Sequence, residues 1–274
     1  MKTVLIMGVL FYVALAAFAW LTADRQIFFP PPSSYTLQSI GATLVPTDDG
    51  AEVATLHLRN PGAELTILFS HGNAEDLGNA LPYLEALRET GYSVIGYDYR
   101  GYGASRGGRP TAEGSYRDIE AVYRHATEDL GIEPGDIVLF GRSVGAGPST
   151  HLAARERVGG MILENAFTSA FVVVTRVTLL PFDRFPNLRN IRGAECPVLI
   201  IHAMRDEIIP IAHGRQLYEA APGPKRHLWV EGARHNDVAL VGGASYWRAL
   251  GEFRSLVAAA PPGRNDDPPA GITQ

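Results

Sequence analysis

Short apolar runs that alternate with longer helical stretches constrain the fold of this chain more than any other feature. Each run is bounded by glycine or polar residues, as is typical of buried strands. Strands that alternate with helices form βαβ units, so the pattern predicts an α/β fold with a mostly parallel central sheet and helices on both faces. The six runs are Leu65–Ser70, Ser93–Tyr97, Asp136–Phe140, Met161–Leu163, Val198–His202 and His227–Val230.

An antiparallel hairpin is expected before the first of these runs. Its arms, Thr36–Pro46 and Glu52–Asn60, are rich in β-branched residues and are separated by the turn sequence Thr47–Gly50. Two of the expected helices, Ala74–Thr90 and Ala112–Leu130, each stop directly before a glycine. A glycine at that position commonly ends a helix.

The length of 274 residues suits one large domain with short appendages. We expect the α/β domain to span residues 25–260 and, from its Pro, Gly and Asp content, a disordered tail over 261–274. The segment 169–190 follows the run that ends at Leu163 and contains two prolines. Two interpretations of it stay open: a lid over a pocket, or a packed helix and loop.

The N-terminal residues 1–24 contain an uncharged run, Val4–Leu21, that is long enough as a helix to span about 27 Å. It predicts a transmembrane anchor, while Lys2 and the small-x-small sequence Ala17–Ala19 leave a cleaved signal peptide as the alternative. Because Lys2 favours a cytoplasmic N-terminus, both alternatives place the α/β domain on the non-cytoplasmic side, either anchored or secreted. The aromatic and proline sequence Phe28–Pro32 predicts an extended connector at the membrane interface.

Charge and cysteine content exclude several classes of function. The net charge is -5, and the 24 Lys and Arg residues are scattered, so nucleic acid is not an expected partner. The one cysteine, Cys196, adjoins an apolar run and is expected to be buried and inert. Neither a multi-cysteine metal site nor an organic cofactor is expected.

The segment Asp136–Gly145 predicts a strand, a tight turn and a helix start, with the sequence Gly-x-Ser-x-Gly at the turn. The glycines let the strand and the helix approach each other closely around a strained serine. This context makes Ser143 the candidate nucleophile. Because a serine hydroxyl is a poor nucleophile at neutral pH, a base and an orienting acid must lie close to it.

The candidate base is His235, which lies in a polar loop after the last predicted strand. The candidate acid is Asp206, which follows the run ending at His202 and precedes His235, in the chain order serine, acid, histidine. Glu164, at the end of an earlier run, is the alternative acid. Other histidines, His71 and His202 among them, are expected to be structural.

The oxyanion formed after nucleophilic attack needs preorganised backbone N–H donors. We expect one from Val144, which follows the nucleophile, and one from the turn after the first parallel strand. In that turn Asn73 is the better candidate and Ala74 the second, and Gly72 allows a close approach to the substrate.

Four ordered motifs together resemble the Bem46-type α/β-hydrolases, relatives of the membrane-associated ABHD-type depalmitoylases; they are Phe69–Asp76, Tyr97–Ser105, Gly141–Pro148 and Gly232–Asp237. The resemblance covers about residues 25 to 258 and implies a serine-hydrolase site of the composition described above, often with an N-terminal membrane segment. The chain departs from the family pattern at Ala203 and Arg234, where glycine is usual. Arg234 is expected to bring positive charge near the pocket.

The expected reaction is cleavage of an ester or thioester through an acyl-enzyme, on a small-molecule or acylated, lipid-derived substrate. Two alternatives remain from the sequence. One is a serine peptidase of the same fold, and the other is a membrane-tethered binding protein without turnover.

Overall fold

A computed structural model of the chain describes residues 2–175 and 183–259. Its centre is an eight-stranded sheet in the order β1-β2-β4-β3-β5-β6-β7-β8. The first two strands pair antiparallel, as does β2 with β4, and all the other neighbours are parallel. The strands are β1 Thr43–Pro46, β2 Glu52–Leu58, β3 Thr66–Ser70, β4 Ser93–Tyr97, β5 Ile137–Arg142, β6 Gly160–Glu164, β7 Val198–Ala203 and β8 Lys225–Val230. The predicted α/β fold is therefore confirmed.

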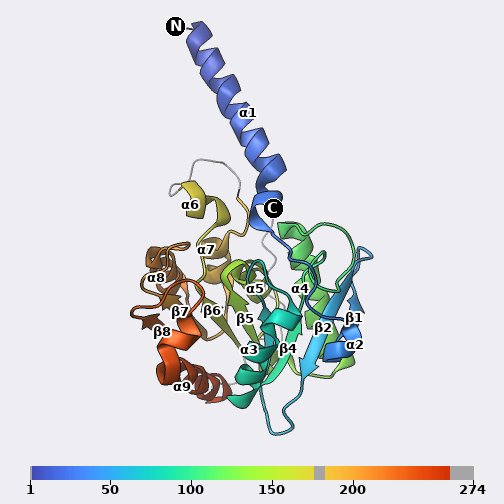
Figure 1. The fold of residues 1–274 in the computed structure, drawn as a ribbon. Helices are drawn as coiled ribbons and strands as arrows, with labels where there is room; N and C mark the ends of the chain where they lie inside the picture. Colours follow the sequence, from blue (N-terminus) through green and yellow to red (C-terminus); the bar gives the residue numbers. More distant parts are fainter. Residues whose placement is uncertain (1, 176–182, 260–274) are drawn as a thin grey trace.

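Helices cover both faces of the sheet (Figure 1). Apolar residues of α3 and α9 pack with one face, and those of α4, α5 and α8 pack with the other, which gives two buried clusters. Burial on both faces explains why the parallel strands are apolar runs without alternation. The helices are α1 Lys2–Ile27, α2 Leu37–Ile40, α3 Leu77–Glu89, α4 Ala112–Arg124, α5 Ala146–Ala153, α6 Ala170–Thr175, α7 Asn187–Asn190, α8 Ile211–Ala220 and α9 Val238–Ala259.

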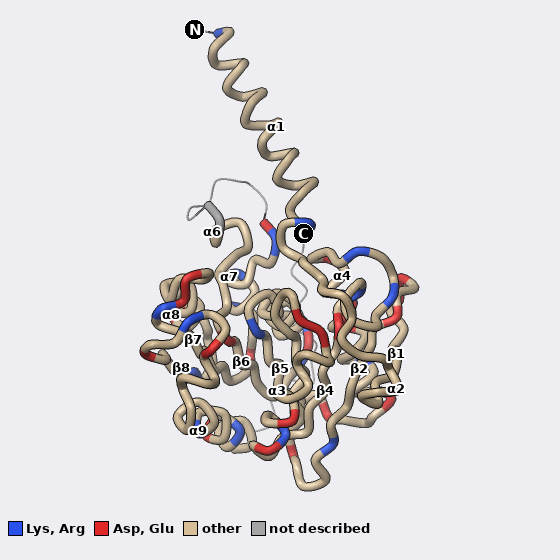
Figure 2. The backbone as a smooth tube through the Cα atoms, viewed as in Figure 1, with Lys and Arg blue, Asp and Glu red and all other residues tan. Residues whose placement is uncertain are grey.

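Helix α1 projects away from the domain (Figure 1), and its length between Lys2 and its last turns carries no charged residue (Figure 2). By length and composition it is able to cross a membrane, with a mean hydropathy of 2.5 over its most apolar 18 residues. The last turns of α1 meet the domain. Asp24 accepts a hydrogen bond from the backbone N–H of Ala112 and lies 3.4 Å from Arg184, whose guanidinium stacks on Trp20.

Three sequence-based expectations about element boundaries need correction. The first arm of the hairpin does not begin at Thr36, because the Thr36 side chain caps the short helix α2 and Gly41 ends it in the left-handed conformation. Helix α3 starts at Leu77, since Asp76 caps it by accepting a hydrogen bond from Asn79. The expected connector at the membrane interface, Phe28–Pro32, does not begin at Phe28, because Phe28 is buried in the core of the domain, whereas Phe29 is exposed.

Candidate active site

Ser143 lies at the sharp turn between β5 and α5, in a short 3-10 turn, Ser143–Gly145. Its φ of 53° is in the left-handed region, which is strained for a residue with a side chain. The two glycines of the motif, Gly141 and Gly145, are required because a side chain at either position would collide with the neighbouring backbone. A Cβ on Gly141 would lie 2.6 Å from the carbonyl oxygen of Gly145, and a Cβ on Gly145 would collide with the backbone of Ser70. Only glycines permit this close approach, and it fixes where the serine projects.

The structure brings Ser143, His235 and Asp206 together in one hydrogen-bonded chain. The Nε2 atom of His235 lies 3.0 Å from Ser143 Oγ, and its Nδ1 lies 2.7 Å from Asp206 Oδ2. The other carboxylate oxygen of Asp206 accepts hydrogen bonds from the backbone N–H groups of Ile208 and Ile209 at 2.9 and 2.7 Å. Asp206 is thus fixed with Oδ2 toward the imidazole, a geometry that holds Nδ1 as the protonated nitrogen and leaves Nε2 to accept the serine proton.

Asn165, at the end of β6, supports this arrangement, and the sequence analysis did not single it out. Its side-chain Nδ2 donates to the carbonyl of His235 at 2.7 Å, and its Oδ1 accepts from the backbone N–H of Ala203 at 2.9 Å. Its φ of 46° turns it toward both loops. An asparagine two residues after an apolar run is the one sequence signal for this role, since asparagine tolerates the left-handed region.

The serine and the imidazole open onto a cavity of about 860 Å³. Both expected oxyanion donors, Val144 and Asn73, line this cavity with Ser143 and His235, and so does Ala74. Much of the remaining lining is apolar. It includes Ala170 and Val173 of α6, Val238, Ala239 and Leu240 of the first turn of α9, and the loop residues Phe167 and Ile208. The described part of the 169–190 insert therefore contributes a wall of the cavity, and its residues 176–182 lie outside the described part, as does the tail 261–274.

An ion pair joins the nucleophile turn to the turn that carries Asn73. Arg142, which precedes Ser143, pairs with Glu75, and the second oxygen of Glu75 accepts from the backbone N–H of Gly72 at 2.6 Å. Burial by itself would raise the pKa of Glu75, but the Arg142 charge and these hydrogen bonds outweigh it and lower the pKa. The pair is a second feature that the sequence analysis did not identify.

Replacing Glu75 with glutamine is expected to lower the free energy of unfolding by about 2 kcal/mol at pH 7, because Arg142 loses its counter-charge in a half-buried site. Since the folded-state pKa of Glu75 is lowered, its ionisation stabilises the native state above its unfolded pKa, and that stability is lost as the pH falls through the folded value. The wild-type and variant stabilities should therefore converge in acid. Urea denaturation from pH 7 downward measures this, and a difference that stays constant with pH would contradict the assignment.

Glu164, the alternative acid, makes other contacts. It is buried, and its Oε2 accepts hydrogen bonds from Tyr246 and, at 3.5 Å, from Tyr83. Burial raises its pKa. It lines the cavity but makes no hydrogen bond to His235, so the structure brings Asp206 and not Glu164 to the imidazole.

Two further polar residues, Glu207 and Arg234, directly neighbour Asp206 and His235 in the chain. Glu207 is exposed and accepts a long, 3.4 Å hydrogen bond from the backbone N–H of His235. Arg234 is exposed and does not itself line the cavity, although the next residue, His235, does; the arginine of the lining is Arg142. Across residues 2–175 and 183–259, no three His, Cys, Asp or Glu side chains cluster in a way that could hold a metal ion.

A family model, related proteins and solved structures that resemble this chain are all described as hydrolases or peptidases. The family model described as "Serine aminopeptidase, S33" matches residues 62–180. The human "Alpha/beta hydrolase domain-containing protein 17B" is 40% identical over 264 residues, with 85% of this chain and 90% of that protein covered. Its Xenopus tropicalis counterpart is 39% identical over 262 residues, which cover 84% and 90%. Among solved structures, the Pyrococcus furiosus esterase Pf2001 superimposes with a TM-score of 0.70 at 19% identity, over 84% of this chain and 98% of the esterase.

Proposed function

Because the chain belongs to the α/β-hydrolase domain-containing protein family, we propose that it is a serine hydrolase that cleaves carboxylic esters or thioesters through an acyl-enzyme. The observation that carries the proposal is the hydrogen-bonded chain from Ser143 through His235 to Asp206, beside a cavity large enough for a substrate. In this proposal Ser143 is the nucleophile, His235 the general base and Asp206 the orienting acid.

The reaction follows from this geometry. Ser143 Oγ attacks the carbonyl carbon while His235 Nε2 takes the hydroxyl proton, and the Asp206 carboxylate stabilises the imidazolium that forms. The backbone N–H groups of Val144 and Asn73 stabilise the tetrahedral oxyanion. Collapse of this intermediate breaks the ester or thioester bond as His235 gives the proton to the leaving alcohol or thiol. Water then attacks the acyl-serine by the same steps, which releases the acid and restores Ser143.

A peptidase is the second candidate, because the matching family model is described as a serine aminopeptidase. An aminopeptidase needs an unpaired carboxylate for the substrate's ammonium group. The acidic residues that line the cavity are Glu75, which is paired with Arg142, and Glu164, whose pKa is raised by burial. The cavity therefore favours uncharged acyl groups. Faster cleavage of aminoacyl amides than of esters would reverse this choice.

The apolar lining of the cavity supports an acylated or lipid-derived substrate. Each methylene buried there contributes about 0.8 kcal/mol, so kcat/KM for p-nitrophenyl esters should rise at least about tenfold from acetyl to octanoyl. Initial rates on a series of esters of increasing chain length, and on matching thioesters, measure this preference. A monotonic fall of kcat/KM with chain length would count against a lipid-derived substrate.

We also propose that α1 anchors the enzyme in a membrane with the catalytic domain on the non-cytoplasmic side. The contacts of Trp20 and Asp24 with Arg184 and Ala112 support retention of α1, because they join its end to the domain. The intact mass of the purified membrane-bound protein decides between an anchor and a signal peptide. A mass that corresponds to cleavage after Ala19 would establish the secreted alternative.

The proposal is tested directly by labelling the folded, full-length protein with a fluorophosphonate, which reacts only with an activated serine. We expect the adduct to map to the peptide that contains Ser143. Folded protein that binds acylated ligands but neither reacts nor turns over substrate would instead establish the non-catalytic binding protein.

A further inference from the structure

At the end of α1 the chain lies against the domain as a short segment, Ile27–Phe29, that we name the strap. The strap is held at its centre by Phe28, whose ring is 5% exposed. The ring packs edge-on against Tyr99, Tyr102 and Phe185, with centroid distances of 6.2, 6.4 and 5.9 Å. The strap is thus a part of the folded domain and not a free linker.

Both ends of the strap are hydrogen-bonded to one side chain, that of Asn73. Asn73 Nδ2 donates to the carbonyl of Ile27 at 2.6 Å, and Asn73 Oδ1 accepts from the backbone N–H of Phe29 at 2.9 Å. The hydroxyl of Tyr102 donates to the same Oδ1 at 2.7 Å and also lies 3.1 Å from the Phe29 nitrogen. The amide of Asn73 is therefore fixed from both sides by backbone atoms that come from the end of α1.

Asn73 belongs to the turn that is expected to supply the second oxyanion donor. Oxyanion stabilisation depends on donors that are already aimed before the reaction, so displacement of this turn weakens the transition state more than the bound substrate. The turn has a strained point next to Asn73, since Ala74 has a φ of 57° and its N–H donates to Asn73 Oδ1 at 2.9 Å. A strained turn of this kind persists only where its surroundings hold it.

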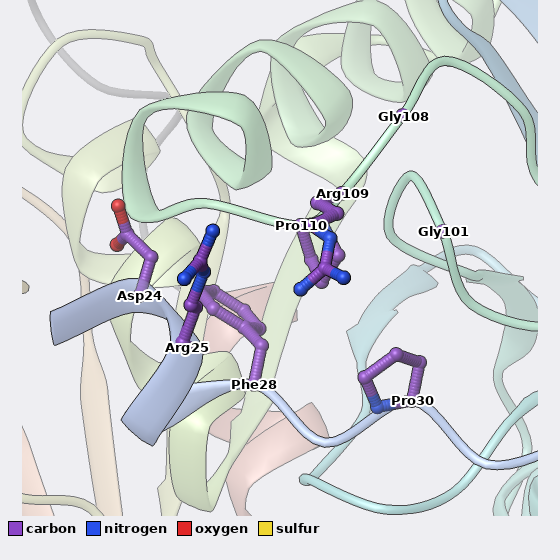
Figure 3. A pocket seen from close by; sticks show the side chains of 8 residues that line it. All are labelled: Asp24, Arg25, Phe28, Pro30, Gly101, Gly108, Arg109 and Pro110. Atoms are coloured by element: carbon purple, nitrogen blue, oxygen red, sulfur yellow. The ribbon is translucent and has the colours of Figure 1, made fainter. Parts of the chain in front are cut away.

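The strap lies between two surface cavities. Gln26, Ile27 and Phe29 line the active-site cavity, while Arg25, Phe28 and Pro30 line a second recess of about 350 Å³ (Figure 3). Between these two cavities the strap contacts the domain through Phe28, Asn73 and Tyr102, and Ile27 also packs against the core. Because Ile27 is the last residue of α1, a displacement of the end of α1 also displaces the hydrogen bonds between the strap and Asn73.

We propose that the strap is a positioning element that holds the Asn73 turn in its reactive conformation, so that the end of the membrane helix is part of the catalytic unit. This inference rests on the proposed function and deepens it. The activity of the hydrolase depends on the seating of its anchor, through the hydrogen bonds between Asn73 and the backbone of Ile27 and Phe29.

The test compares two substitutions of Phe29 in the full-length protein. Phe29→Pro removes the N–H that bonds to Asn73, whereas Phe29→Ala removes the exposed ring and keeps the N–H. Relative to Phe29→Ala, we expect Phe29→Pro to lower kcat by about tenfold, with KM within about twofold. Loss of an oxyanion donor lowers kcat by about 10²-fold or more, and a donor that is only displaced should cost part of this. The inhibition constant of an alkyl boronic acid, which mimics the tetrahedral oxyanion, should rise in the same proportion.

Hydrogen exchange gives a readout that does not depend on activity. The amides of the peptide 71–76 should exchange faster in Phe29→Pro than in Phe29→Ala, with unchanged exchange in β5. If the proline variant does not fold, Tyr102→Phe replaces it and is compared with the wild type. This variant removes the hydroxyl that contacts both Asn73 Oδ1 and the Phe29 nitrogen. Equal exchange and equal kcat in both Phe29 variants overturn the strap proposal. A wild-type protein without hydrolase activity overturns the proposed function alone, and the exchange data still decide the role of the strap.

Discussion

Replacing Ser143 with alanine is expected to lower kcat for an octanoyl ester about 10⁵-fold or more, while the affinity for the substrate stays within a few-fold. The alanine removes the atom that lies 3.0 Å from His235 Nε2, and no acyl-enzyme forms without it. The oxyanion donors and the cavity remain, so residual binding is expected. Steady-state and single-turnover kinetics on the purified full-length protein measure both quantities, and fluorophosphonate labelling should disappear in parallel.

Ser149 provides the matched control for this variant. It lies in α5, six positions after Ser143, and is buried with its hydroxyl directed to that of Ser70 at 3.4 Å. Ser149→Ala changes the same chemical group in the helix that follows the Ser143 turn, but Ser149 contacts neither the imidazole nor the cavity. Its kcat should stay within about threefold of wild type, with a loss of stability of about 1 kcal/mol. More than a tenth of the wild-type activity in Ser143→Ala would reject Ser143 as the nucleophile.

The central strands of the parallel sheet are predictable from the sequence because burial on both faces makes them mostly apolar. The run Ser93–Tyr97 matches β4 at both ends, and Val198–His202 matches β7 to within one residue. The β-branched residues of Thr36–Pro46 predict a strand that includes residues 37–40. Local capping by Thr36 and Gly41 overrides that preference and makes a helical turn.

The components of the site differ in how local their signals are. Ser143 is predictable because its strained turn, its two glycines and its strand all lie within ten residues. The contacts of Asn165 with His235, of Glu75 with Arg142 and of Asn73 with Ile27 join residues 70, 67 and 46 positions apart. Contacts of that kind follow from the packed sheet, and no periodicity in the chain encodes them.

The choice between Asp206 and Glu164 as the acid is where the structure adds most, because both follow strands at the same edge of the sheet. Asp206→Asn is expected to lower kcat about 10⁴-fold at pH 7, since an amide beside Nδ1 favours the wrong imidazole tautomer. The two backbone N–H bonds to Oδ1 keep the side chain in place, so stability should change by only about 1 kcal/mol.

Glu164→Gln is the comparison that makes this result specific. Glu164 lines the same cavity, but its carboxyl group is bonded to Tyr246 and burial raises its pKa, so a neutral amide replaces a group that already resists ionisation. We expect kcat within about threefold of wild type and an unchanged pH profile of kcat/KM. The acid is assigned to whichever residue, Asp206 or Glu164, gives the larger loss of kcat when it is replaced. If Glu164→Gln lost activity by orders of magnitude while Asp206→Asn kept it, His235 would be oriented from β6 and the hydrogen bond at Nδ1 would not be the catalytic one.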